Sequence, residues 1–477
     1  MYKPTILKEN KKYNALELLL KFNLKNKDEL TQLLITLREY GYLNMYVKNE
    51  NSIVKRTSIE KVFMLSAWDD INQRVRFDFN LVGLLILPNN TCIISYPKYI
   101  SDFNIELDIK NNYKKFKQIM KVIEKYKHKN AQDVFGIDTI NNIQNDNIGV
   151  QLSILKRFYE MGLFHKEVDI ISSGEEGQIL WNNTISNITP FIVGQTPVYL
   201  DFYTQKIQED SLNIIRLIHS IIITEISSEF KNILEVIGYY PVIMTEKSFD
   251  DIGGKDYAYN LVEKELRSQY VTKNKELLKE LLCYIKQVKY HTHNEVKFYG
   301  TSSFNLVWED VCRAVYHNHL EYTFEKLGIL NPGKNSSNQI TMKEYIEKPQ
   351  WLMPDDTFIN ANSTLELDVL NIQNGEFNIY DAKYYNVYFE NGRIQGQPGV
   401  SDITKQYLYQ LLFKDVIKHN ELVPSNNFII PKDELENDNE LYTVSKMNMF
   451  HDLEENLREI NVIARDCQNI YKEYLDM

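Results

Sequence analysis

The stretch LELDVLNIQNGEFNIYDAKYYN (365–386) decides the expected fold. Its first part alternates well enough for a strand, and the Asn-Gly pair after it is typical of the tight turn in a β-hairpin. The second strand ends on Asp381 and Lys383, whose side chains share one face because they are two residues apart. The hairpin can bring Asp368 beside them. The sequence therefore predicts two carboxylates and one amine at one end of a sheet.

Such a set of side chains suits the hydrolysis of a phosphodiester bond. Oxygen ligands at this density favour a hard cation such as Mg²⁺. The cation polarises the phosphate and lowers the pKa of a bound water. Lys383 can orient that water or stabilise charge that develops on the phosphate. Without a cation the like charges repel, and one carboxylate tends to keep its proton.

A helix is predicted before the hairpin, at SFNLVWEDVCRAVYHNHLEY (303–322). Apolar residues recur along it at helical spacing and predict a stripe that faces the core. The stripe consists of Phe304, Val307, Trp308, Val311, Cys312 and Val315. Glu309 falls near the edge of this stripe, from where its carboxylate could reach a bound cation or its water shell. The candidate metal ligands are therefore Asp368, Asp381 and Glu309.

A second helix is predicted after the hairpin, at SDITKQYLYQLLFKDV (401–416). We expect Ile403, Tyr407 and Leu411 to form its buried row, with Gln406 on a neighbouring face. Helix, strand, strand and helix then follow one another, and they carry Glu, Asp, Asp-x-Lys and Gln in that order. This is the arrangement of the PD-(D/E)XK nuclease core, in which helices flank a mixed sheet.

The remaining sequence predicts further helices and strands. The start of the chain has helical patterns at 15–22 and 28–43, and 74–100 reads as two strands around a Pro-Asn-Asn turn. The basic stretch at 113–130 predicts a helix whose charges face solvent, with phosphate contact as the alternative. One long amphipathic helix is expected over 259–288.

Chain length and breaks in pattern suggest three parts. At 477 residues the chain is long enough for about two to four domains. The polar stretch 245–257 contains a Gly-Gly pair and is a candidate boundary. We expect a mixed α/β, multidomain chain with a small helical module at 1–60, a β-rich partner-docking region at 61–245, and the domain that contains the hairpin at 246–477.

The composition places limits on the class of protein. With 43% hydrophobic and 25% charged residues, the chain has enough apolar material for packed cores and is not mainly disordered. A net charge of −11 argues against non-specific coating of nucleic acid, although a locally basic groove remains compatible with it. Its four cysteines form no CxxC pair, and the most apolar segment (213–226) is too short and polar to span a bilayer. We expect a soluble cytoplasmic protein without membrane contact.

Several segments of the sequence, taken in the order in which they occur, resemble the LlaJI family of restriction endonucleases. That family is similar to the McrC subunit of the McrBC system. The resemblance runs from about residue 75 onward. The matching phrases are VGLLIL…ISYPKYI (82–100), EGQILWNNTI (176–185), YGTSSFNLVWEDVCRAVY (299–316), the LDVL…IYDAKYY hairpin and GVSDITKQYLYQ (399–410). A D-x-K motif alone says little about the family. The segment DAKYY, when it follows a strand and precedes DITKQYLYQ, is fairly specific for it.

The resemblance implies a Mg²⁺-dependent DNA endonuclease subunit of a phage-defence restriction system that cuts unmodified double-stranded DNA. Its implied partner is an McrB-like AAA+ GTPase, which would hold the GTP. By position, Asp368, Asp381 and Lys383 are implied to be catalytic, with Glu309 and Gln406 as auxiliary residues. Cutting two strands normally needs two sites, so pairing of nuclease domains is also expected.

Two alternatives remain open at the level of the sequence. The family's first acid often follows a proline, whereas Leu367 precedes Asp368, and Pro354-Asp355 supplies a literal Pro-Asp upstream. We prefer Asp368 because a tight hairpin positions it directly. In the second alternative, the chain is a non-catalytic adaptor that binds DNA and stimulates the GTPase of its partner.

Overall fold

The computed structural model divides the chain into two compact units. One comprises Ile137–Phe298 with Leu87–Asn89 and Met1, and the other comprises Tyr2–Ile86, Asn90–Gly136 and Tyr299–Met477. The described residues are 4–49, 52–53, 58–87, 91–101, 109–133, 147–174, 176–210, 213–231, 233–234, 238–290, 296–333, 337–390, 393–433, 441–447 and 459–477. The predicted fold class, a mixed α/β chain with several sheets, is confirmed. The units differ from the three expected parts because the N-terminal residues cluster with the C-terminal ones.

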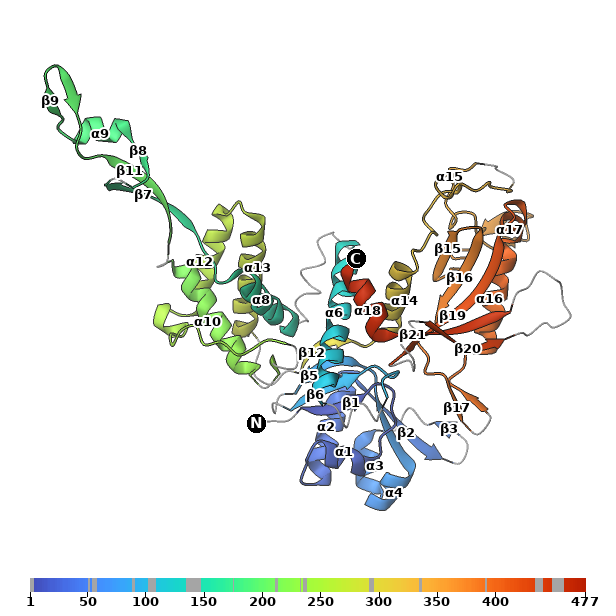
Figure 1. Cartoon of the computed structure of the whole chain (residues 1–477). Helices are drawn as coiled ribbons and strands as arrows, with labels where there is room; N and C mark the ends of the chain where they lie inside the picture. The colour runs from blue at the N-terminus through green and yellow to red at the C-terminus, as the bar shows by residue number, and fades with distance from the viewer. Residues whose placement is uncertain are drawn as a thin grey trace. The chain divides into compact units, whose positions relative to one another are not determined.

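The first unit combines a group of helices with small antiparallel sheets (Figure 1). Its packed helices are α8 (Asn147–Met161), α10 (Ile214–Glu229), α12 (Lys255–Ser268) and α13 (Thr272–Tyr290). Its strands are β7 (Glu167–Ser173), β8 (Gln178–Ile179), β9 (Phe191–Val193), β10 (Thr196–Val198) and β11 (Tyr203–Glu209), with α9 (Trp181–Asn187) between them and η1 (Asp250–Ile252) before α12.

The single long helix expected over 259–288 is wrong, because the structure has two helices there. The first, α12, ends at Ser268, and α13 begins at Thr272. Between them the side-chain oxygen of Gln269 accepts hydrogen bonds from the backbone N–H groups of Tyr270 and Val271, both at 3.1 Å. A side chain that binds nearby backbone donors in this way competes with continuation of the helix.

The N-terminal part of the second unit contains the predicted helices and strands. The helices expected at 15–22 and 28–43 are present as α1 (Ala15–Lys21) and α2 (Lys27–Glu39), and the second ends at Glu39 rather than at 43. A four-stranded sheet has the order β1 (Thr5–Lys8), β6 (Cys92–Tyr96), β5 (Val82–Ile86) and β12 (Lys297–Thr301). Further elements are β2 (Leu43–Asn49), β3 (Ser52–Ile53), β4 (Val75–Phe79), α3 (Ile59–Leu65) and α4 (Trp68–Arg74). The stretch 74–100, where two strands were expected, has a third among its described residues, because β4 precedes β5 and β6. Strands β5 and β6 pair antiparallel as expected, while the turn at 88–90 lies outside the described residues.

The basic helix is present as α6 (Ile109–Asp133), but it does more than expose its charges. Lys115 forms a buried ion pair with Asp433 at 2.7 Å. Lys125 Nζ donates to the carbonyl of Tyr474, and Lys129 Nζ lies 2.6 Å from Asp310 Oδ1. The expected solvated face is therefore wrong for Lys115, because this helix packs against C-terminal elements of the same unit.

The C-terminal part of the second unit is built on a five-stranded mixed sheet. The order is β15 (Val369–Gln373), β16 (Glu376–Ala382), β19 (Val423–Lys432), β21 (Ile460–Asp466) and β20 (Leu441–Met447). Strands β16, β19 and β21 are parallel, and the two edge strands are antiparallel to their neighbours. The surrounding elements are α14 (Phe304–Val315), α15 (Phe324–Leu327), α16 (Val400–Leu412), α17 (Lys414–His419), α18 (Cys467–Asp476), β13 (Gln350–Leu352), β14 (Phe358–Asn360), β17 (Tyr388–Glu390) and β18 (Arg393–Gln395).

Helices cover both faces of this sheet at β16. Phe377 and Ile379 pack with residues of α16 in one buried cluster. Tyr380 points to the opposite face, because side chains alternate along a strand, and its ring lies 4.5 Å from that of Tyr316 at the end of α14. The strand that carries Asp381 is thus held between two helices, as the sequence predicted.

The predicted helix over 303–322 is too long at its C-terminal end. The structure ends α14 at Val315, and His317 has a φ of 49° in the left-handed region. The side-chain oxygen of Asn318 then accepts from the backbone N–H groups of Leu320 and Leu370. This asparagine replaces helical hydrogen bonds and ties the end of α14 to the first strand of the hairpin.

Among the described residues, no helix combines the length and the apolar character that crossing a membrane would require.

Candidate active site

The hairpin of β15 and β16 places the candidate acids. Asn374 and Gly375 both have positive φ, at 54° and 80°, which is the geometry of a type I′ turn. The strand register pairs Val369 with Tyr380. Continued by one residue, this register places Asp368 opposite Asp381. Asp368 Oδ2 accepts a hydrogen bond of 2.8 Å from the backbone N–H of Ala382. The structure therefore brings Asp368 to the end of β16 that carries Asp381 and Lys383.

Lys383 lies between two carboxylates. Its Nζ is 2.7 Å from Asp381 Oδ2 and 3.0 Å from Asp402 Oδ1. The Tyr385 hydroxyl also donates to Asp402, at 3.2 Å. Burial alone would lower the pKa of Lys383, but its bonds to Asp381 and Asp402 outweigh burial and raise it. Lys383 is therefore held as a charged ammonium at the end of the strand.

Asp402 is a site residue that the sequence reasoning missed. It lies in the first turn of α16, where an acid is usually assigned to helix capping, and its side chain does accept from the Gly399 N–H. Burial would raise the pKa of Asp402, but the bond to Lys383 and the charge of that lysine lower it instead. The sequence signal that could have identified Asp402 is its position in the segment GVSDITKQ, between the hairpin and Gln406.

The acids of the hairpin are strongly perturbed. Burial and then the charge of Asp368 raise the pKa of Asp381 to about 6, against the opposing effect of Lys383. Burial and then the charge of Glu309 raise the pKa of Asp368. These mutual effects mean that the three carboxylates are close enough to repel one another, and a cation between them would relieve that repulsion.

Glu309 lies on α14 with about a quarter of its side chain exposed. Burial raises its pKa, and the nearby guanidinium of Arg313 opposes that shift. Arg313 is a second residue that the sequence reasoning missed: its NH2 group lies 3.9 Å from Glu309 and 4.0 Å from Asp368 Oδ1, and its Nε donates to the Asp368 carbonyl. Arg313 therefore offsets part of the acid charge.

Gln406, expected on a face next to the buried row, is itself fully buried. Its Nε2 is 3.4 Å from the carbonyls of Ile379 and Asn427, on two neighbouring strands. The predicted buried row is wrong in part, because Tyr407 is buried while Leu411 is 40% exposed. The helix turns Gln406 and Gln410 toward the sheet, because Gln406 bonds the backbone of the sheet and Gln410 accepts from the Asn426 side chain. Gln406 therefore contacts the strand that carries Asp381 rather than the acids themselves.

Asp355, the alternative first acid, lies apart from this arrangement. It is exposed in the turn between β13 and β14, and its carboxylate accepts from the N–H and hydroxyl of Thr357. Those two bonds lower its pKa. Asp368 is thus the acid that shares the hairpin with Asp381 and Lys383.

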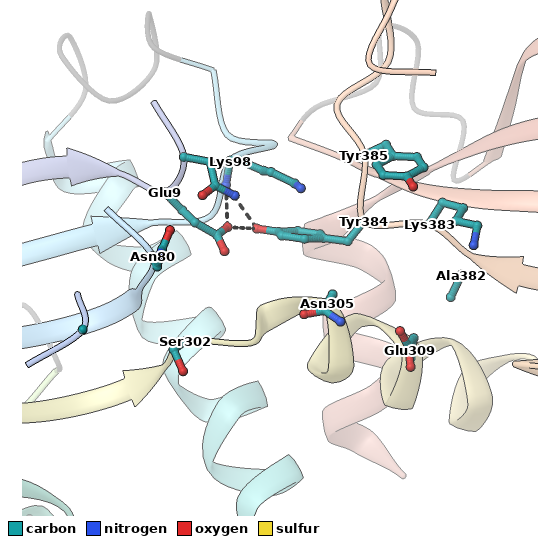
Figure 2. Close-up of a pocket in the computed structure, with 12 residues that line it drawn as sticks. Glu9, Asn80, Lys98, Ser302, Asn305, Glu309, Ala382, Lys383, Tyr384 and Tyr385 are labelled. Carbon is teal, nitrogen blue, oxygen red and sulfur yellow. Dashed lines mark hydrogen bonds between the residues drawn. The ribbon is translucent and has the colours of Figure 1, made fainter. Parts of the chain in front are cut away.

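A polar cavity of about 530 Å³ opens beside Lys383 (Figure 2). The residues that line it are Glu9, Asn10, Gly41, Asn80, Lys98, Ser302, Asn305, Glu309, Ala382, Lys383, Tyr384 and Tyr385. Of the predicted site residues, Glu309 and Lys383 belong to this lining. Its size lies in the range of ligand-binding pockets, about 300 to 1,000 Å³.

The carboxylates of Asp368, Asp381 and Glu309 are of the kind that binds a hard cation, but they are not arranged around one in this structure. Among the described residues, no three His, Cys, Asp or Glu side chains are gathered as a metal-binding group. Asp381 is turned toward Lys383, and Asp368 toward the Ala382 N–H. The chemistry of the set nevertheless fits, because oxygen-only carboxylates with raised pKa values gain most from a divalent ion.

The raised pKa of Asp381 predicts a pH-dependent stability in the absence of divalent ions. The folded chain keeps a proton on Asp381 up to about pH 6, whereas an unfolded chain releases it near pH 4. Stability should therefore fall as the pH rises through this interval, since the fold disfavours the ionised form. Asp381→Asn should flatten this slope in urea denaturation at pH 4.5 and 7.0 with a chelator present. If the free energies of unfolding of wild type and Asp381→Asn changed with pH in the same way, that result would contradict the raised pKa of Asp381.

Comparison with known proteins gives the family. Residues 81–466 match the model of the LlaJI restriction endonuclease family. The Type II restriction enzyme BsuMI component YdjA of Bacillus subtilis (strain 168) is 29% identical over 366 residues, which are 73% of each chain. A solved structure, a half-complex from a tetradecameric assembly of Thermococcus gammatolerans McrB AAA+ hexamers with bound McrC, is similar at a TM-score of 0.38 and 11% identity, covering 99% of this chain and 100% of that one. Because the family match spans most of the sequence, the chain belongs to the LlaJI restriction endonuclease family.

Proposed function

We propose that the chain is the nuclease subunit of a restriction system and hydrolyses phosphodiester bonds of unmodified double-stranded DNA at the end of β16. The observation that carries this proposal is Lys383, held charged beside Asp381, which lies opposite Asp368 on the same hairpin. The family match supports a restriction nuclease in general terms. The mixed sheet between α14 and α16 is consistent with a PD-(D/E)XK core, which we propose for this domain.

In this proposal Asp368 and Asp381 hold a Mg²⁺ ion, and Glu309 binds it or its water shell. When bound, such an ion polarises the scissile phosphate and lowers the pKa of water. Lys383 orients the attacking water and stabilises the negative charge that grows on the phosphate. Gln406 keeps β16 in place from its buried position.

Asp402 gives Lys383 a second anchor. If Asp381 turns toward a cation, Lys383 loses its 2.7 Å partner but keeps the carboxylate of Asp402 at 3.0 Å. Tyr385 and the Gly399 N–H hold that carboxylate in turn. Asp402 is therefore a positioning residue in this proposal: it maintains the charge and place of the ammonium while Asp381 changes partners.

We also propose that an McrB-like AAA+ GTPase drives the reaction, with GTP on the partner and not on this chain. The support is the sequence resemblance described above, together with the name of the Bacillus relative, which calls that protein a component of an enzyme. Cutting both strands needs two sites, so we propose that two nuclease domains pair on the DNA.

A reconstitution tests this function. The chain is incubated with unmodified plasmid DNA and Mg²⁺, with and without the GTPase partner and GTP. We expect cleavage only in the complete mixture, and none after chelation of divalent ions. In the adaptor alternative, the chain stimulates GTP hydrolysis while Asp381→Asn leaves any DNA cleavage unchanged. That result would reject a catalytic role for this site.

A further inference from the structure

Lys98 lines the same cavity as Lys383 but comes from a distant part of the sequence (Figure 2). It lies in the loop after β6. Its backbone N–H is shared between Glu9 Oε2 at 3.3 Å and the Tyr384 hydroxyl at 3.1 Å, and that hydroxyl donates to Glu9. Because Tyr384 directly follows Lys383, these bonds tie the Lys98 backbone to the end of β16.

The ammonium of Lys98 has no carboxylate or hydrogen-bond acceptor of its own among the described residues. Its Nζ lies over the Tyr384 ring, 4.4 Å from the centroid, and 5.9 Å from the centroid of Tyr385. Lys383, in contrast, pairs with two carboxylates. Burial lowers the pKa of Lys98, and the charge of Glu9 opposes this shift. The ammonium has therefore lost part of its hydration without gaining a direct anionic partner.

We propose that Lys98 binds a backbone phosphate of the DNA strand that is cut, next to the phosphate at Lys383. This proposal rests on the proposed function. In Figure 2, Asn80 and Lys98 lie on one side of the view, and Glu309 and Lys383 on the other. A strand that enters the polar cavity would meet Glu309 and Lys383 at one end and the Lys98 ammonium at the other, which suits a run of successive phosphates.

The carboxylate of Glu9 opposes the binding of an anion at Lys98, since its charge acts on the Lys98 ammonium. It also lines the cavity, so its carboxylate weakens the attraction for phosphate. Its Oε2 is already engaged by the Lys98 backbone N–H and the Tyr384 hydroxyl. Burial also raises the pKa of Glu9, against the effect of these bonds. The Glu9 carboxylate therefore binds the backbone of the loop, and the Lys98 ammonium stays available for a phosphate.

The test uses two substitutions at one position. Lys98→Met keeps an unbranched stem over Tyr384 but removes the charge, and Lys98→Arg keeps the charge. Lys61→Met, at an exposed position of α3 outside the cavity lining, is the matched control. Affinity for a fluorescent duplex is measured by anisotropy on the reconstituted complex, in Ca²⁺ to prevent cutting, over a range of salt concentrations. Thermal melting of each variant checks its folding.

We expect Lys98→Met to bind about tenfold more weakly and to lower the slope of log K against log[salt] by about 0.9, the value for one phosphate contact. Lys98→Arg and Lys61→Met should keep the wild-type slope. A folded Lys98→Met protein with unchanged affinity and slope would overturn the proposal. Competition by a mononucleotide with no change in the slope would assign the site to a free nucleotide and also overturn it.

Failure of this inference is distinguishable from failure of the proposed function. If the wild-type complex cleaves DNA while Lys98→Met binds and cleaves like wild type, only the phosphate contact is wrong. If the complete wild-type mixture cleaves no DNA but the salt slope changes as expected, Lys98 contacts DNA and the catalytic proposal is wrong.

Discussion

Asp368→Asn should reduce the rate of DNA cleavage by a factor on the order of 10³ or more, because it removes a charged ligand from the site where phosphate charge must be stabilised. Asp368 lies opposite Asp381 and bonds the Ala382 N–H within the same hairpin. The substitution keeps the size of the side chain, and an amide oxygen can still accept that hydrogen bond. A loss of rate would therefore reflect the missing charge and not a lost strand contact.

The matched control for this prediction is Asp355→Asn. Asp355 is the acid of the literal Pro-Asp sequence, but it lies in an exposed turn and bonds Thr357. We expect this variant to cleave DNA at the wild-type rate in single-turnover assays with the complete system. A large loss from Asp355→Asn together with wild-type cleavage by Asp368→Asn would exchange the roles of the two acids.

Trp308→Ala should lower the free energy of unfolding by about 3 to 5 kcal/mol, the range for truncating a large buried aromatic side chain. Trp308 is fully buried on α14, and its indole N–H donates to the Ile429 carbonyl at 3.3 Å. Its ring also packs edge-on against Tyr471 of α18. The substitution leaves a cavity between α14, α18 and the sheet, and the Ile429 carbonyl is left with its bond from the Lys383 backbone N–H.

Trp351→Ala is the control for that loss, because Trp351 on β13 is 68% exposed. We expect its free energy of unfolding to stay within about 0.5 kcal/mol of wild type. Urea denaturation followed by circular dichroism compares the two variants under the same conditions. Equal midpoints for Trp308→Ala and wild type would mean that α14 does not pack on the sheet as described.

The sequence predicted the hairpin because its signals are local. An Asn-Gly pair accepts positive φ at both turn positions, and the register that follows from it aligns Asp368 with Asp381. The spacing of Asp381 and Lys383 required only the alternation of a strand. The apolar stripe of α14 was likewise readable, since Phe304 and Trp308 recur at helical spacing and are buried.

The features that were missed depend on contacts between distant parts of the chain. Asp402 and Arg313 gain their roles only when their helices pack beside β16. The glutamines of α16 are buried because they find polar partners on the sheet, which a hydrophobicity pattern cannot indicate. Glu9 and Lys98 meet Tyr384 across hundreds of residues, so no local pattern could place them in one cavity.

The decisive measurement is an anomalous-difference map from crystals of the chain grown with Mn²⁺ at neutral pH, where Asp381 is ionised. We predict a peak within coordination distance of a carboxylate oxygen of both Asp368 and Asp381, with Lys383 still beside Asp402. A map with no peak at these two acids, or with Mn²⁺ bound only elsewhere while Asp381 stays paired to Lys383, would contradict a metal-dependent nuclease site on this hairpin.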